Sequence, residues 1–137
     1  DCNKKFGFSA QKTLEIAQDL YEKFKVLTYP RTGSRYLSDD IKGDVPGLFE
    51  LLKVHPVLGK HAAKVSSLPL SGRPFNNNKV TDHHAIIITE VLAGNDLPQD
   101  HRKVYDLVAT RLLAAFSEPC KKQNIKYVFV NSGIEFI

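Results

Sequence analysis

Apolar residues recur every three or four positions in two long segments, and this spacing constrains the fold more than any other feature of the chain. In the first segment, about residues 9–24, Ser9 is suited to capping a helix. In the second, about residues 98–116, Pro98 suits the first turn of a helix and Pro119 stops it. We therefore predict two amphipathic helices, each burying one apolar stripe.

Glycine and proline divide the rest of the chain into short pieces. Ser38 precedes a helix start that breaks near Gly43 and restarts after Pro46, and a further short helix follows Pro56. Residues 66–80, rich in Ser, Pro, Gly and Asn, predict a surface loop. Residues 85–89 fit either a strand or an irregular run, and the pattern leaves that choice open.

The end of the chain has the pattern of a β-hairpin. Residues 125–130 and 133–137 alternate around Asn131, Ser132 and Gly133. A length of 137 residues suits one hydrophobic core, so we expect residues 1–137 to form a single domain, mainly α with a small β-hairpin. The lack of methionine and the strand-like last residues favour a piece of a longer protein.

Composition excludes several classes of protein. A hydrophobic fraction of 42% with 25% charged residues is typical of a globular chain, not a disordered or fibrous one. The longest apolar runs are too short to cross a bilayer, so no membrane partner is expected. Cys2 and Cys120 match no metal-ligand spacing and are interpreted as reduced thiols, and no metal site is expected. A net charge of +4 allows a polyanionic partner without requiring one.

Residues 28–38 concentrate groups suited to phosphodiester chemistry. Pro30 keeps Tyr29 out of a helix, and Arg31 and Arg35 follow in the same short loop. A phenol is a poor nucleophile at its usual pKa near 10, so a neighbouring cation that favours the phenolate and neutralises the transition state is needed. Arg31 is the candidate for that role, and Arg35 for clamping a flanking phosphate. From the residues alone, Tyr29 packed on the core beside solvated arginines is the commoner arrangement for such a segment, and the spacing does not overturn that interpretation.

Three separated motifs, in the right order, resemble those of type IA topoisomerases, most closely the topoisomerase III branch. The segment YPRTGSRYL (29–37) resembles their active-site tyrosine motif. Residues 6–22 resemble the helix before that tyrosine, TDHHAII (81–87) their second active-site motif, and residues 104–116 the helix that returns to the toroidal gate. The resemblance therefore spans nearly the whole chain.

The resemblance implies a role for each motif residue. Tyr29 would attack a backbone phosphate of single-stranded DNA and form a 5′-phosphotyrosyl link, while Arg31 neutralises that phosphate and His83 contacts a nearby phosphate or supports transition-state charge. His84 is expected to be structural. Further DNA contacts are expected from a set of four residues: Arg35, Ser34, Thr32 and Lys12.

Two positions depart from the family's pattern. Gly33 stands where many relatives carry an acidic residue, so a carboxylate that helps to organise the site is missing. Ile88 stands where a proline is usual, which puts the path of residues 85–90 in question.

The family's fold and cofactor define further expectations. The resemblance implies a winged-helix-like, catabolite-activator-like tyrosine domain, with residues 125–137 leading into the neighbouring gate domain. Mg²⁺ in these enzymes is held by a Toprim domain that this chain lacks, so the chain alone is expected to be inactive and to carry no cofactor. Its partners would be single-stranded DNA, the remaining enzyme domains and, through the hairpin edge, another copy, in the bacterial cytoplasm on nucleoid or plasmid DNA.

Two other functions fit the residues less closely. In a non-enzymatic helix-turn-helix module, Arg31 and Arg35 would touch the DNA backbone and Tyr29 would be structural. In a protein-interaction domain the basic charge would be incidental.

Overall fold

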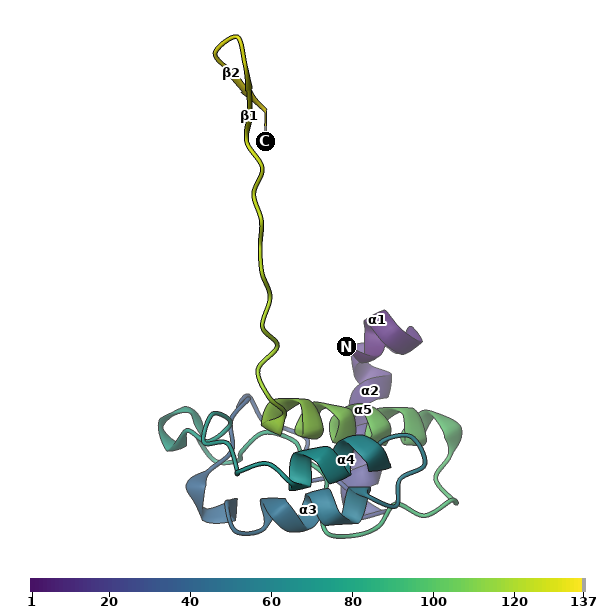
Figure 1. Ribbon diagram of the computed structural model, residues 1–137. Helices are drawn as coiled ribbons and strands as arrows, with labels where there is room; N and C mark the ends of the chain where they lie inside the picture. The colour runs from purple at the N-terminus through teal and green to yellow at the C-terminus, as the bar shows by residue number, and fades with distance from the viewer. Residues whose placement is uncertain (137) are drawn as a thin grey trace.

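The protein, seen in a computed structural model that describes residues 1–136, is mainly helical (Figure 1). The helices form a body from which a C-terminal arm, residues 118–136, projects (Figure 1). In the body α2 (Ala10–Glu22) packs against α5 (Gln99–Phe116), while α4 (Gly59–Ser66) packs against both α3 (Val45–Leu52) and α5. The predicted mainly helical fold with a small hairpin is confirmed.

Helix α2 begins where its sequence predicted. The Ser9 hydroxyl accepts a hydrogen bond from the Lys12 backbone N–H at 3.1 Å, and the buried stripe includes Ile16 and Leu20. A short helix, α1 (Cys2–Phe6), precedes it and was not predicted. Gly7 ends α1 with a φ of 71°, a conformation that glycine adopts without strain.

Helix α5 runs through the centre of the hydrophobic core. Its Tyr105 is 1% exposed, and burial raises the pKa of that phenol. At the other end of the helix, the Phe116 ring packs on Phe49 at 5.3 Å and on Phe75 at 5.7 Å between centroids.

Neither α5 nor any other helix within residues 1–136 is long and apolar enough to cross a membrane.

The turn between α3 and α4 is held by His55. Its Nδ1 accepts hydrogen bonds from the backbone N–H groups of Val57 at 3.2 Å and Leu58 at 3.1 Å. Since Nδ1 is an acceptor, Nε2 carries the proton and donates it to Asp106 at 3.0 Å. One side chain therefore joins this turn to α5.

Gly59 has no room for a larger side chain. A methyl group on its Cα would collide with the backbone carbonyl oxygen of Lys53, at the end of α3. We expect Gly59→Ala to lower the free energy of unfolding by about 1–3 kcal/mol, as measured by chemical denaturation. Gly47→Ala in α3 is the control, because a Cβ there meets no atom within 4 Å. Equal destabilisation by the two substitutions would contradict this account.

Two extended segments far apart in the sequence, residues 26–28 and 87–89, pair within the body. The Thr28 N–H donates to the Ile87 carbonyl at 2.9 Å, and the Thr89 N–H donates to the Val26 carbonyl at 3.0 Å. Between them Leu27 and Ile88 form an isolated antiparallel bridge, and each is 1% exposed. The run that the sequence left open is thus extended without being a full strand.

The loop of residues 66–80 is also tied to the body. The Leu37 N–H donates to the Pro74 carbonyl at 2.8 Å, and the Asn76 N–H donates to the Leu37 carbonyl at 2.9 Å. Two single turns of 3₁₀ helix lie nearby, η1 (Asp39–Ile41) and η2 (Asn77–Lys79). The predicted helix start after Ser38 is therefore η1, and its restart is α3.

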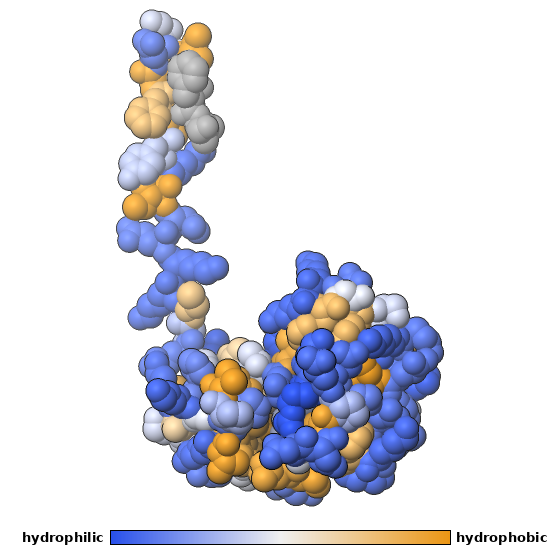
Figure 2. Space-filling model, turned by 90° about the vertical axis from the view of Figure 1, so that its right-hand side faces the viewer, coloured by the Kyte–Doolittle hydropathy of each residue, from blue (hydrophilic) through white to orange (hydrophobic). Residues whose placement is uncertain are grey.

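The arm ends in an antiparallel hairpin of β1 (Phe129–Asn131) and β2 (Ile134–Phe136). Ser132 and Gly133, with φ of 51° and 82°, make the turn. The predicted hairpin is present with shorter strands, and residue 137 of the prediction lies outside the described residues. Apolar side chains of the arm are exposed (Figure 2): Ile125, Tyr127, Val128, Phe129, Val130 and Ile134.

Candidate active site

Tyr29 directly follows the bridged segment, so buried backbone fixes the point from which its side chain extends. Its ring is half-buried and packs against two other rings. The Tyr21 ring lies 5.5 Å away at 86°, and the His83 ring lies 4.2 Å away at 33°. Among residues 1–136 the Tyr29 hydroxyl has no hydrogen-bond partner, so it is free for an incoming group.

His83 reaches Tyr29 because two loops are joined by hydrogen bonds. The Thr32 hydroxyl donates to the His83 carbonyl at 2.8 Å, and the Ala85 N–H donates to the Tyr36 carbonyl at 2.8 Å. Together with the pairing of residues 26–28 and 87–89, these bonds hold the exposed imidazole of His83 against the phenol. The structure thus brings together two of the predicted catalytic residues.

The hydroxyls of Thr32 and Ser34 are engaged inside the tyrosine loop. Thr32 Oγ1 accepts from the Ser34 N–H at 3.1 Å, and Ser34 Oγ accepts from the Tyr36 N–H at 3.1 Å. Ser34 Oγ also donates to the Lys79 carbonyl at 2.8 Å. Both hydroxyl protons are therefore donated to carbonyls outside the tyrosine loop, those of His83 and Lys79, and DNA contact by these hydroxyls stays a prediction.

Arg31 and Arg35 are exposed in the same loop. Neither guanidinium forms an ion pair or hydrogen bond with another group in the described part of the chain. Arginine keeps its charge at any physiological pH and presents a fork of N–H donors that matches two phosphate oxygens. Two cations without partners among the described residues, in the same loop as a free phenol, favour an anionic, phosphate-bearing ligand.

The backbone does not require glycine at position 33. Its φ is not positive, and a Cβ built on it meets no atom within 4 Å. We expect Gly33→Asp to change the melting temperature by no more than about 2 °C, because this substitution is exposed and unstrained. Differential scanning calorimetry measures the change, and a fall comparable to that of a core substitution would show that the position requires glycine.

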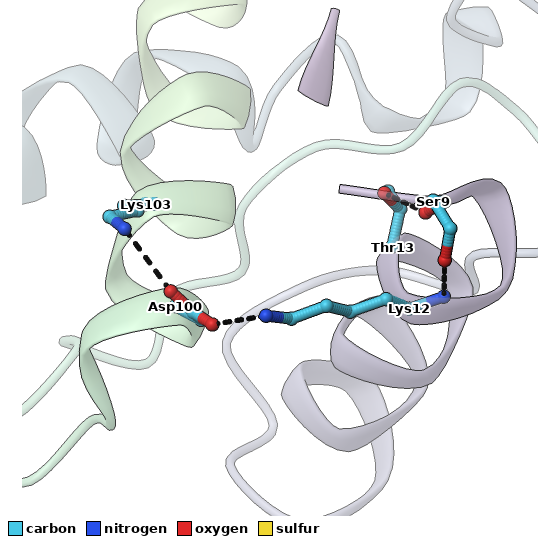
Figure 3. Close-up of polar contacts among 5 residues, drawn as sticks. All are labelled: Ser9, Lys12, Thr13, Asp100 and Lys103. Atoms are coloured by element: carbon cyan, nitrogen blue, oxygen red, sulfur yellow. Dashed lines mark hydrogen bonds and ion pairs between the residues drawn. The ribbon is translucent and has the colours of Figure 1, made fainter. Parts of the chain in front are cut away.

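Lys12 lies in the first turn of α2 and extends toward Asp100 of α5 (Figure 3). Its Nζ is 2.5 Å from Asp100 Oδ2 and 4.3 Å from the centre of the Phe8 ring, and Lys103 also pairs with Asp100 at 3.2 Å. Hydrogen bonds from Lys12 and Lys103 hold the pKa of the Asp100 carboxyl below its usual range. Lys12 is about 14 Å along the α2 axis from Tyr21. The structure joins Lys12 to α5, and its DNA contact stays a prediction.

His84 has a local partner, in keeping with the structural role expected of it. Its Nδ1 donates to the Ala85 carbonyl at 2.7 Å. Within residues 1–136 no group of three or more His, Cys, Asp or Glu side chains is placed to hold a metal ion.

The neighbour that sequence reasoning missed is Tyr21. Its place in the α2 stripe marked it as a core residue, and it does lie on the half-buried face of that helix. Only the reversal after α2, through Lys25 with a φ of 60°, turns the chain back so that Tyr29 meets Tyr21.

Comparison with known proteins identifies the family. A family model described as DNA topoisomerase matches residues 1–137. The DNA topoisomerase 3 of Bacillus licheniformis is 43% identical over 138 residues, covering 98% of this chain and 19% of the relative. The DNA topoisomerase 3 of Bacillus anthracis is 50% identical over 120 residues, which cover 83% of this chain and 16% of the relative. The DNA topoisomerase 3 of Bacillus subtilis strain 168 is 40% identical over 142 residues, which cover 99% of this chain and 19% of the relative.

The chain thus spans about a fifth of the length of the curated relatives it matches. The family match includes the tyrosine loop, the histidine loop packed against it and the helices before and after them. The resemblance stated from the motifs is therefore confirmed. This chain belongs to the type IA DNA topoisomerase family, on its topoisomerase III branch.

Proposed function

We propose that this chain is the tyrosine-bearing domain of a type IA DNA topoisomerase and that Tyr29 cleaves single-stranded DNA. The phenol loses its proton and its oxygen bonds to a backbone phosphorus. The bond from that phosphorus to the 3′ oxygen breaks, and the 3′ oxygen takes up a proton. The product is a 5′-phosphotyrosyl link with a free 3′-hydroxyl, and the reverse reaction reseals the strand after another strand has passed.

The placement of Tyr29 carries this proposal. Its hydroxyl is free among the described residues, its ring is held against His83, and the exposed Arg31 stands two residues away. A nucleophile needs this combination of a reachable oxygen and a nearby cation where negative charge develops.

The neighbouring residues divide the remaining work. Arg31 neutralises the attacked phosphate, and His83 supports transition-state charge or holds the next phosphate. Arg35 binds a flanking phosphate through its guanidinium fork. Thr32 and Ser34 shape the loop and bind DNA when their hydroxyl protons turn from the His83 and Lys79 carbonyls to a phosphate oxygen. Lys12 contributes to a phosphate-binding surface.

The rest of the enzyme lies outside this chain in the proposal. A Toprim domain supplies the carboxylates that hold Mg²⁺, so the isolated chain lacks cleavage and relaxation activity. The helical body corresponds to the family's winged-helix-like domain, and the hairpin leads into the neighbouring gate domain. Its exposed edge also allows isolated chains to pair. The enzyme acts in the cytoplasm on nucleoid or plasmid DNA, as its bacterial relatives suggest.

End-labelled oligonucleotides test the chemistry directly. Full-length enzyme carrying this segment is incubated with single-stranded DNA, and the complex is trapped with detergent and digested with protease. A 5′-phosphotyrosyl link retains the 3′ label on the peptide that contains Tyr29. Retention of the 5′ label, or a labelled peptide from elsewhere, would exclude the proposal.

A further inference from the structure

The Tyr29 side chain has to be oriented without using its oxygen. Within the described residues its hydroxyl has no hydrogen-bond partner, and the proposed attack requires that freedom. Orientation therefore depends on contacts with the faces and edges of the ring. Two aromatic contacts of this kind lie within the described residues, with His83 at 4.2 Å and with Tyr21 at 5.5 Å between centroids.

Of these two rings, Tyr21 is the more firmly anchored. It lies in the last turn of α2, beside the fully buried Leu20. The Leu20 carbonyl accepts hydrogen bonds from the Val26 N–H at 2.9 Å and from the Leu27 N–H at 3.4 Å, just before Tyr29. His83, by contrast, is exposed and lies outside any helix or strand. The helix end and the nucleophile thus share one rigid frame.

We propose that Tyr21 is a positioning residue that sets the orientation of the Tyr29 ring through their edge-to-face contact at 86°. This inference rests on the proposed role of Tyr29 as nucleophile. An edge-to-face pair aligns the positive edge of one ring with the negative face of the other, which disfavours rotation of the Tyr29 side chain out of line. The Tyr21 hydroxyl has no part in this contact.

The test compares Tyr21→Leu and Tyr21→Phe in full-length enzyme. Under single turnover at saturating single-stranded DNA, Tyr21→Leu should lower the rate constant of adduct formation about fivefold with an unchanged Kd for DNA. Tyr21→Phe keeps the ring and should restore the wild-type rate. The matched control is Phe24→Leu near the same helix end, whose ring packs on His101 at 5.7 Å, and it should leave the rate unchanged.

A second readout uses this chain itself and needs no catalysis. In wild type and Tyr21→Phe, nuclear Overhauser contacts between the Tyr29 and His83 rings should be strong, and in Tyr21→Leu they should weaken. If Tyr21→Leu does not fold, Tyr21→Met replaces it in both assays.

The outcomes separate this inference from the proposed function. An undiminished rate in Tyr21→Leu, or a loss in Tyr21→Phe as large as in Tyr21→Leu, overturns the positioning role while Tyr29 remains the nucleophile. A wild-type adduct that maps to another residue overturns the proposed function, and the ring contacts then report only on packing.

Discussion

Replacing Tyr29 with phenylalanine should abolish the covalent protein–DNA adduct in full-length enzyme carrying this segment. The substitution removes the only atom that bonds to phosphorus and keeps the ring that packs on Tyr21 and His83. Binding of single-stranded DNA should weaken by less than about fivefold, because at most one hydrogen bond is lost. Detergent trapping measures the adduct, and fluorescence anisotropy measures binding.

The matched control for this experiment is Tyr36→Phe. Tyr36 lies in the same loop and is also half-buried, with its hydroxyl 3.4 Å from Lys79 Nζ. It should keep the adduct. An adduct that persists in Tyr29→Phe and disappears in Tyr36→Phe would move the nucleophile to the second tyrosine.

Replacing Arg31 with glutamine should lower the cleavage rate constant by about 10²–10³-fold, the usual cost of removing a group that stabilises developing charge. Arg31→Lys should recover part of that loss, since it restores the charge without the planar fork. The rate constant is measured under single turnover, so that product release does not limit it.

Arg35→Gln is the comparison that separates catalysis from binding. Arg35 is also exposed and unpaired within residues 1–136, and it lies four residues further along the loop. Its loss should weaken DNA binding. The slope of the binding constant against salt concentration, on logarithmic axes, should fall by about one, as expected for one lost phosphate contact. The rate constant of cleavage at saturating DNA should change little. A negligible effect of both glutamine variants on the rate at saturating DNA would assign both arginines to binding alone.

The long helices were predictable because their signals are local. Ser9 as a cap and Pro98 as a helix start gave α2 and α5 their first residues to within one position. Helix α1 was missed because a five-residue helix with no buried residue has no periodic stripe. The hairpin was recognised from Asn131, Ser132 and Gly133, although its strands are shorter than the alternating pattern suggested.

The sequence predicted which residues belong to the site but did not predict the hydrogen bonds and ring contacts that bring them together. The resemblance paired Tyr29 with His83, but the bonds that hold them together join Thr32 to a carbonyl 51 residues away. No local pattern reveals such a partner. The same limit applies to Ser34, which donates a hydrogen bond to the Lys79 carbonyl. It also applies to Lys12, which forms an ion pair with Asp100, 88 residues away.

The stretch between α5 and the hairpin limits how far the two can separate. Residues 118–128 contain no helix or strand, and extended backbone of that length reaches about 36 Å. If the hairpin is fixed to another part of the enzyme, the helical body could travel a distance comparable to a DNA duplex diameter with no helix unwinding. The tether would then set the greatest separation between the hairpin and the helical body, and shortening it by a few residues would reduce that separation without touching Tyr29.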